Sequence, residues 1–161
     1  GAIGVGVNEA EVCARFARDA DFDCFLLAGR YTLLEQGALD DFLPLCAERN
    51  IGIMLGGPYN SGILATGAIP GARYNYRDAP PEILERVGRI QAVCQRHGVP
   101  LAAAAIQFPL AHPAVASMIP GAVTPYEVTR NARLMQLPIP ADLWAELKHE
   151  GLLRADAPVP R

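Results

Sequence analysis

The hydrophobic residues of the chain fall into four short runs in which apolar side chains do not alternate with polar ones. A strand with one exposed face would alternate, whereas a strand covered on both faces is apolar throughout. The pattern therefore predicts four buried strands of the kind found in parallel sheets. They comprise residues 2–7, 23–28, 51–55 and 115–119.

Helices are predicted between and after these runs, where apolar residues recur at spacings of three and four positions. The first follows Asn8, a suitable N-cap because Glu9 and Glu11 supply acidic residues to the first turn. Residues 38–49 also fit a helix, in which Pro44 is expected to cause a kink. The remaining helices are expected from Pro81 up to Gly98, and over residues 101–111, 125–135 and 140–149.

The order of these elements favours an α/β fold that is half of a TIM (β/α)8 barrel. Each predicted strand is followed by a helix, and four such units make half of a barrel. A small doubly wound sheet is the alternative. We favour the half barrel because the strands end in small or polar residues, where a barrel carries its active-site loops. Residues 59–79, rich in Gly, Pro, Asn and Tyr, are expected to form a long loop.

Composition narrows the class of protein. The 161 residues include 14 Lys and Arg against 17 Asp and Glu, and this net charge of −3 does not favour nucleic-acid binding. No apolar run approaches the ~20 residues of a membrane helix, and no signal peptide is recognisable. The four cysteines lack Cys-x-x-Cys spacing, so we expect reduced thiols in a cytoplasmic protein without a metal site. Because the chain starts without Met inside an apparent strand, we expect a fragment of a longer protein.

Three segments, in order, resemble the aldo-keto reductase superfamily. The end of that family's fifth strand is similar to Ile3-Gly4-Val5-Gly6-Val7-Asn8. The segment after its seventh strand is similar to Gly57-Pro58-Tyr59-Asn60-Ser61-Gly62-Ile63-Leu64-Ala65-Thr66-Gly67. The eighth strand and its helix are similar to Ile119-Pro120-Gly121 followed by Asn131. The second segment looks most like the branch of D-threo-aldose 1-dehydrogenases and L-fucose dehydrogenases.

The resemblance covers nearly the whole chain. It implies that residues 1–161 are the C-terminal half of a single barrel domain, with strands five to eight. The family's catalytic Asp, Tyr, Lys and His belong to the first four strands, so the resemblance implies no catalytic residue here. Lys148, the only lysine, does not fall at a matching place. His97 and His112 are expected to be ordinary helix-ending histidines.

The half that is present resembles the part of the family that binds a dinucleotide. A pyrophosphate requires close approach of the backbone and several N–H donors, which a glycine-rich loop provides. The resemblance implies that the loop after the third strand wraps this group. Its candidate residues are Gly57, Pro58, Tyr59, Ser61, Gly62 and Leu64.

The resemblance also implies a nicotinamide contact at the end of the first strand. Asn8 would hold the carboxamide there, and its role as a helix N-cap is a compatible alternative. The family's Gln and Tyr at the ends of the next two strands are replaced by Ala28 and Gly56, so two contacts are missing. Tyr31 is expected to be mainly a packing residue.

The last segment of the resemblance is expected to hold the adenosine end. Members that prefer NADP place Lys and Arg against the 2′-phosphate at the positions of Gly121 and Glu127. A carboxylate repels a phosphate but accepts hydrogen bonds from ribose hydroxyls, so we expect NAD, with NADP as the alternative. Arg130 opposes this prediction, and Glu127 also fits a capping box with Thr124. Asn131 is expected to reach the adenine.

These implications lead to a specific expected reaction. The intact protein would oxidise an aldose at C1 to a lactone, with the dinucleotide taking the hydride. The partner is then a small sugar or aldehyde, and Tyr74, Asn75 and Tyr76 on the long loop suit a sugar. A general NADPH-dependent aldehyde or pyridoxal reductase is one alternative. The other is a half barrel that binds a nucleotide without redox chemistry. The oligomeric state stays open.

Overall fold

The computed structural model describes residues 1–161 and contains a four-stranded parallel sheet with the order β1-β2-β3-β6. Its strands are β1 (Gly4–Val7), β2 (Cys24–Ala28), β3 (Gly52–Gly56) and β6 (Val115–Ile119). Each pairs with its neighbour in this order, so β2 lies between β1 and β3. The four predicted strands and their parallel arrangement are therefore confirmed.

The predicted helices are present, with two corrections. They are α1 (Ala10–Asp19), α2 (Phe42–Glu48), α4 (Pro81–Arg96), α5 (Leu101–Gln107), α6 (Pro125–Leu134) and α7 (Ala141–His149). Residues 38–49 are divided between a 3₁₀ turn (Gly37–Leu39) and α2. Pro44 does not interrupt α2, because it is the third residue, and a helix needs no N–H donor at that position. The N-cap of α1 is Glu9, so the expected capping by Asn8 is wrong.

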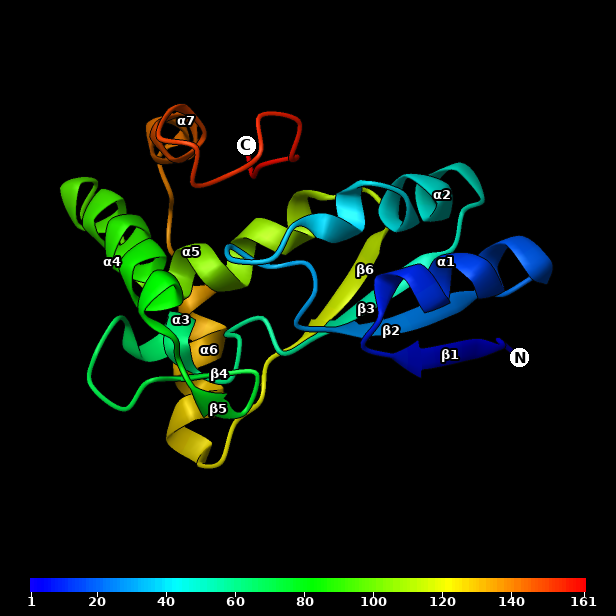
Figure 1. Ribbon diagram of the computed structural model, residues 1–161, viewed down its shortest axis with the longest axis horizontal. Helices are drawn as coiled ribbons and strands as arrows, with labels where there is room; N and C mark the ends of the chain where they lie inside the picture. The colour runs from blue at the N-terminus through cyan, green and yellow to red at the C-terminus, as the bar shows by residue number, and fades with distance from the viewer.

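The helices cover one face of the sheet. In Figure 1, α1, α2 and α5 all lie on the same side of the strands. In β2 and β3 the residues on this side, Phe25, Leu27, Ile53 and Leu55, are buried, whereas the intervening residues are only partly buried. A doubly wound sheet has helices on both faces, so this one-sided arrangement favours half of a barrel, whose other face lines the barrel interior.

The predicted loop 59–79 contains secondary structure that its sequence did not indicate. It holds α3 (Ile63–Thr66) and an antiparallel hairpin made of β4 (Arg73–Tyr74) and β5 (Arg77–Asp78). The two turn residues, Asn75 and Tyr76, have positive φ angles of 49° and 64°. Such turns usually carry Gly in the second position. Because Tyr76 stands there, the sequence pattern did not reveal the hairpin.

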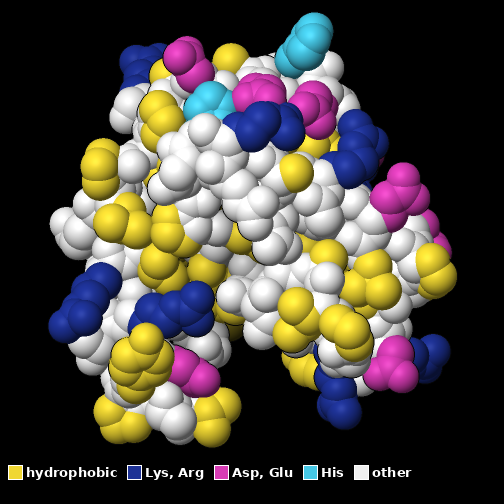
Figure 2. Space-filling view, turned by 90° about the vertical axis from the view of Figure 1, so that its left-hand side faces the viewer, with side chains coloured by type: hydrophobic (Ala, Val, Ile, Leu, Met, Phe, Trp, Pro, Cys, Tyr) yellow, Lys and Arg dark blue, Asp and Glu magenta, His cyan; other side chains and the backbone are white.

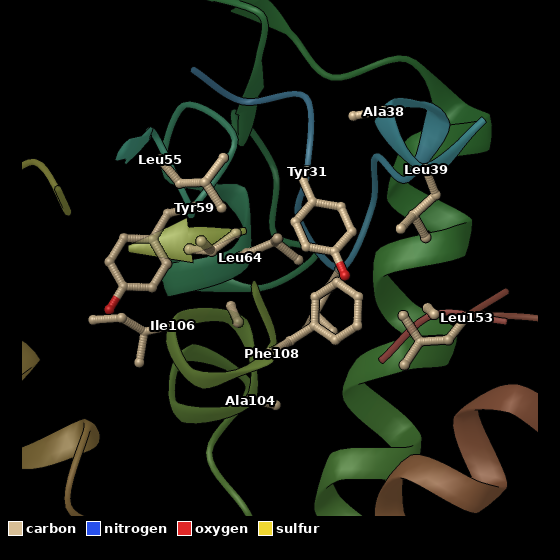
Figure 3. Close-up of a cluster of buried hydrophobic side chains, with 14 of the residues drawn as sticks. Tyr31, Ala38, Leu39, Leu55, Tyr59, Leu64, Ala104, Ile106, Phe108 and Leu153 are labelled. Carbon is tan, nitrogen blue, oxygen red and sulfur yellow. The ribbon is translucent and has the colours of Figure 1, made fainter. Parts of the chain in front are cut away.

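The core lies between the sheet and the helices that cover it, and Figure 3 shows its part around Tyr31. The ring of Tyr31 lies 5.2 Å from that of Phe108 and 5.7 Å from that of His112. Phe108 in turn lies 6.2 Å from Trp144 of α7. Tyr31 is only 1% exposed, so its predicted packing role is confirmed. Burial lowers the pKa of His112, whose Nδ1 accepts the backbone N–H of Ala114.

The four cysteines are free thiols. Burial raises the pKa of Cys13 and Cys94 to about 11 and that of Cys46 to about 12, whereas Cys24 is partly exposed. No three potential metal-ligating side chains come together. None of the helices combines the length and apolar character needed to cross a membrane.

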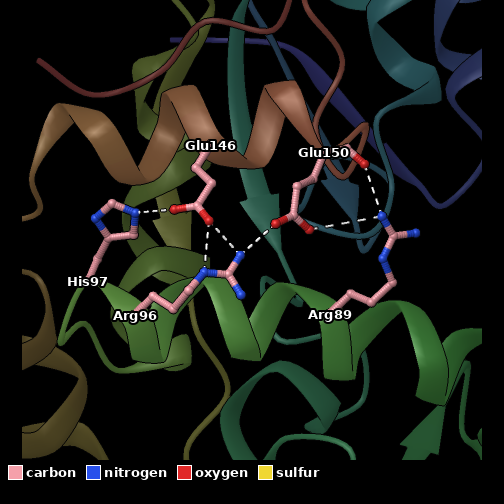
Figure 4. A network of polar contacts seen from close by, with 5 residues as sticks. All are labelled: Arg89, Arg96, His97, Glu146 and Glu150. Atoms are coloured by element: carbon pink, nitrogen blue, oxygen red, sulfur yellow. Dashed lines mark hydrogen bonds and ion pairs between the residues drawn. The ribbon is translucent and has the colours of Figure 1, made fainter.

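Charged residues fasten α7 to α4 (Figure 4). Nη2 of Arg96 lies 2.5 Å from a carboxylate oxygen of Glu146 and 2.5 Å from one of Glu150. His97, which directly follows α4 as predicted, places Nε2 2.5 Å from Glu146 Oε2. The hydrogen bonds from His97 and then Arg96 lower the pKa of Glu146. The network fixes α7, and with it Trp144, against the rest of the fold.

Candidate functional site

The carboxyl ends of β1, β2 and β3 point toward α3, α6 and the β4–β5 hairpin (Figure 1). A cavity of about 600 Å³, which we call the polar cavity, lies at these strand ends. Its lining includes Asn8, Arg30, Gly57, Ser61, Asn75 and Arg77. This volume falls within the roughly 300–1,000 Å³ of small-molecule sites. Three of the predicted site residues, Asn8, Gly57 and Ser61, therefore converge on one cavity.

The loop that follows β3 is held by short-range backbone hydrogen bonds. The N–H of Asn60 donates to the carbonyl of Gly57 at 3.1 Å, and that of Gly62 donates to the carbonyl of Tyr59 at 3.0 Å. Gly57, Asn60, Ser61 and Gly62 all have positive φ angles, between 45° and 99°. The N–H of Ser61 has no acceptor in the protein, so this turn leaves a backbone donor available at the polar cavity.

The side chain of Asn60 anchors the same loop to the segment that leaves β2. Its Nδ2 donates to the carbonyl of Gly29 at 3.2 Å, and its Oδ1 accepts the hydroxyl of Thr32 at 2.5 Å. Asn60 is 4% exposed, so these bonds are shielded from water. Asn60 was not among the predicted site residues, because its partners lie far from it along the chain.

The β4–β5 hairpin closes another side of the polar cavity. The N–H of Tyr76 donates to Ser61 Oγ at 3.0 Å. Nη1 of Arg30 donates to Asn75 Oδ1 at 3.2 Å, which joins the hairpin to the end of β2. Tyr74, Asn75 and Tyr76, the loop residues expected to suit a sugar, all line the cavity. Arg30 and Arg77 also line it, and neither was predicted from the sequence.

Small residues occupy the ends of β2 and β3 at the polar cavity, where Ala28 lines it and Gly56 does not. Ala28 and Gly56 are neighbours at the ends of β2 and β3. A Cβ atom added to Gly56 would lie 3.3 Å from that of Ala28, so the two backbones approach closely here. Because neither residue has a polar side chain, side-chain hydrogen bonds to a ligand must come from other residues that line the cavity.

Pro58, Tyr59 and Leu64 are buried beneath the loop instead of lining the cavity. Leu64 is 0% exposed, and its N–H donates to the carbonyl of Tyr59 at 3.1 Å. The expected pyrophosphate contact of Leu64 is therefore corrected: it is a core residue. The hydroxyl of Tyr59 turns toward α6 and donates to Asn131 Oδ1 at 2.8 Å. Burial raises the pKa of this hydroxyl.

The predicted capping box at the start of α6 is confirmed. Thr124 Oγ1 accepts the N–H of Glu127 at 3.3 Å, and Glu127 Oε2 accepts the N–H groups of Thr124 and Val123 at 3.3 and 2.6 Å. The second carboxylate oxygen of Glu127 makes no hydrogen bond within the protein. Gly121 is exposed before this helix, and Arg130 is partly buried on it.

Asn131 lies apart from the polar cavity. It lines a cavity of about 400 Å³ between α5, β6 and α6, which we call the apolar cavity because its side chains include Ile106, Met118, Val128 and Met135. The predicted residues are thus divided between two places, which the Tyr59–Asn131 hydrogen bond links. Figure 2 shows a hollow at the lower edge of the molecule, between two projecting parts. This hollow lies at the level of α6 and the hairpin in Figure 1.

Comparison with known proteins identifies the family. The model described as "Aldo/keto reductase family" matches residues 1–150. The chain belongs to the aldo/keto reductase family. This match confirms the resemblance found in the sequence. Members of the family are oxidoreductases.

Individual relatives agree with this assignment. D-threo-aldose 1-dehydrogenase from Pseudomonas sp is 46% identical over 153 residues, which cover 94% of this chain and 46% of that protein. Pyridoxal 4-dehydrogenase from Microbacterium luteolum is 43% identical over 150 residues, 93% of this chain and 44% of that protein. The chain thus spans slightly less than half the length of these aldo/keto reductase relatives.

The solved structure of an aldo-keto reductase from Bacillus halodurans in its holo form superposes with a TM-score of 0.72. The sequences are 22% identical, and the match covers 96% of this chain and 50% of that one. The four strands and their helices therefore form part of a TIM barrel, and the predicted fold class is confirmed.

Proposed function

We propose that residues 1–161 form the C-terminal half of an aldo/keto reductase barrel and hold most of its nicotinamide dinucleotide. The whole protein would be an NAD-dependent dehydrogenase that oxidises an aldose at C1 to a lactone. One observation carries this proposal, namely the convergence of Asn8, Gly57 and Ser61 on the polar cavity at the carboxyl ends of the strands. In a barrel, that end is where ligands bind.

The residues of the polar cavity fit such a cofactor. The side-chain amide of Asn8 makes no hydrogen bond within the protein, and an amide can both donate to and accept from a carboxamide. The unpaired N–H of Ser61 can donate to a phosphoryl oxygen. A bound nicotinamide ring supplies hydride transfer. Asn8 would orient that ring, while the loop that begins at Gly57 would hold the pyrophosphate.

The start of α6 supports NAD over NADP. Gly121 has no side chain, and Glu127 keeps one carboxylate oxygen outside the capping box. A carboxylate would repel a 2′-phosphate and accept hydrogen bonds from free ribose hydroxyls. Arg130, on the same helix, would instead favour NADP, because a guanidinium group attracts a 2′-phosphate. Thr124 would act by fixing the first turn in which Glu127 lies.

The relatives support two classes of substrate. The similarity to a D-threo-aldose 1-dehydrogenase favours an aldose, and the amide, hydroxyl and aromatic groups of the polar cavity suit a polyhydroxylated ligand. Pyridoxal is the second candidate, because a pyridoxal 4-dehydrogenase is 43% identical to this chain. A ratio of kcat/KM for L-fucose and pyridoxal, measured on the whole protein, decides between them.

Titration of the chain with NADH and NADPH, followed by nicotinamide fluorescence, tests the cofactor assignment. We expect the folded chain to bind NADH more tightly than NADPH. Asn8→Ala should weaken NADH binding about tenfold and leave the binding of ADP-ribose, which lacks the carboxamide, unchanged. Tighter binding of NADPH would overturn the preference for NAD and implicate Arg130. A folded chain that binds neither dinucleotide would favour the half barrel without redox chemistry.

A further inference from the structure

Two arginines line the polar cavity without a carboxylate partner. Arg30 is partly buried at the end of β2, and its Nη1 donates only to neutral oxygens, those of Gly29 at 3.3 Å and Asn75 at 3.2 Å. Arg77, on β5, is exposed, and its side chain makes no hydrogen bond or ion pair. Asp78 is the single carboxylate among the lining residues, and it makes no ion pair with either arginine.

Several other arginines, unlike these two, have a carboxylate partner. Arg18, Arg49, Arg96 and Arg154 each lie within hydrogen-bonding distance of an Asp or Glu. A partly buried guanidinium without a counterion is unfavourable in the free protein, because it has lost water and gained no opposite charge. The positive charge at the polar cavity is therefore available to an anionic ligand.

The hairpin fixes this charge beside a backbone donor. Tyr74 and Arg77 are paired across the hairpin, and the turn between them is bound at both residues. Asn75 holds Arg30, and the N–H of Tyr76 is bound to Ser61 Oγ. Ser61 also carries the free backbone N–H of the preceding loop. The two guanidinium groups and this N–H therefore belong to segments that are tied together around one cavity.

This combination suits phosphoryl oxygens. Guanidinium groups make charge-assisted hydrogen bonds to phosphates, and N–H groups of turns with positive φ form anion-binding concavities. The hydroxyl groups of a neutral sugar require no compensating charge. The two cations therefore favour a pyrophosphate over a neutral sugar in the part of the cavity next to Ser61.

We propose that Arg30 and Arg77 neutralise the pyrophosphate of the bound dinucleotide, so that the β4–β5 hairpin is a functional part of the cofactor site. This inference rests on the proposed function, since it presupposes that a dinucleotide occupies the polar cavity. It adds two charged residues to a site for which the sequence resemblance indicated mainly backbone contacts.

The test compares Arg77→Ala and Arg30→Ala with Arg73→Ala. Arg73 lies on the same hairpin and is exposed, its side chain makes no hydrogen bond or ion pair, and it does not line the polar cavity. Binding of NADH is measured by fluorescence at several salt concentrations, and folding is checked by circular dichroism. We expect each cavity variant to bind NADH about tenfold more weakly and with a smaller salt dependence. Arg73→Ala should change the affinity less than twofold.

A second probe separates loss of charge recognition from loss of structure. Inorganic pyrophosphate should displace NADH from the unmodified chain, and should do so less effectively from Arg77→Ala. Because Arg77 is exposed and unpaired, this variant is expected to unfold at the same temperature as the original chain. If NADH binds and both cavity variants behave like Arg73→Ala, the inference is wrong while the proposed function stands. If the folded chain binds no NADH, the proposed function fails, and the inference fails with it.

Discussion

The buried hydrogen bond between Tyr59 and Asn131 links the loop after β3 to α6, and Tyr59→Phe should reveal its contribution. The hydroxyl of Tyr59 donates to Asn131 Oδ1 at 2.8 Å, and both residues are 8% exposed. Phenylalanine keeps the ring but leaves this buried amide oxygen without a donor. An unsatisfied buried acceptor costs about 1–3 kcal/mol. In a chain of this size, 2 kcal/mol corresponds to a fall in melting temperature of roughly 4–8 °C.

Urea unfolding followed by circular dichroism measures this effect, and a double-mutant cycle isolates the bond. Tyr59→Phe and Asn131→Leu should each destabilise the chain. The double variant should be less destabilised than the sum of the two by about 1–2 kcal/mol, because no partner is then left unpaired. Tyr126→Phe is the control, since Tyr126 is 72% exposed and its hydroxyl makes no hydrogen bond. If Tyr59→Phe unfolds at the same urea concentration as this control, the bond does not stabilise the fold.

Three further predictions concern the hairpin, the α4–α7 contact and the thiols. Tyr76→Gly removes a side chain from a left-handed position, so urea titration should show the free energy of unfolding rising by about 1 kcal/mol. Hydrogen bonds from His97 and Arg96 lower the pKa of Glu146, so its carboxylate stabilises the fold above the ordinary pKa of about 4.3. That stabilisation should disappear as the pH falls through the lowered pKa, and Glu146→Gln should make urea midpoints less sensitive to acid. A thiol reagent at neutral pH should label Cys24 first, because burial keeps the other three thiols protonated and inaccessible; rapid labelling of all four would contradict their burial.

The sequence predicted the sheet better than the segment that follows β3. The strands were identified because the runs around Phe25 and Ile53 are apolar on both faces, a pattern that local sequence fully expresses. The hairpin was missed because its turn is Asn75-Tyr76 instead of Asn-Gly. Its geometry depends partly on the hydrogen bond from Tyr76 to Ser61, a contact between residues 15 positions apart. The residues next to Tyr76 in the sequence therefore do not indicate that bond.

The same distinction explains which candidate residues were found. Asn8 and Gly57 directly follow β1 and β3, two strands that were predicted, so topology alone brings them to one end of the sheet. Asn60 and Arg30 acquire their positions from partners 31 and 45 residues away. Their neighbours in the sequence do not indicate these contacts, although Asn60 lies in the segment that resembles the family. Leu64 shows the opposite error, because it lies within the family-like segment but its side chain completes the core.

The residues that stabilise the fold are mostly different from those that are expected to bind the ligand. Asn8 and Arg77, which line the polar cavity, lie after β1 and on the β4–β5 hairpin, and both are exposed. Substituting Asn8 or Arg77 should therefore change affinity with little change in stability. Tyr59 and Asn131 are different, because one buried bond joins the loop of the polar cavity to the helix of the apolar cavity. A perturbation there should affect the fold and both ends of a bound dinucleotide together.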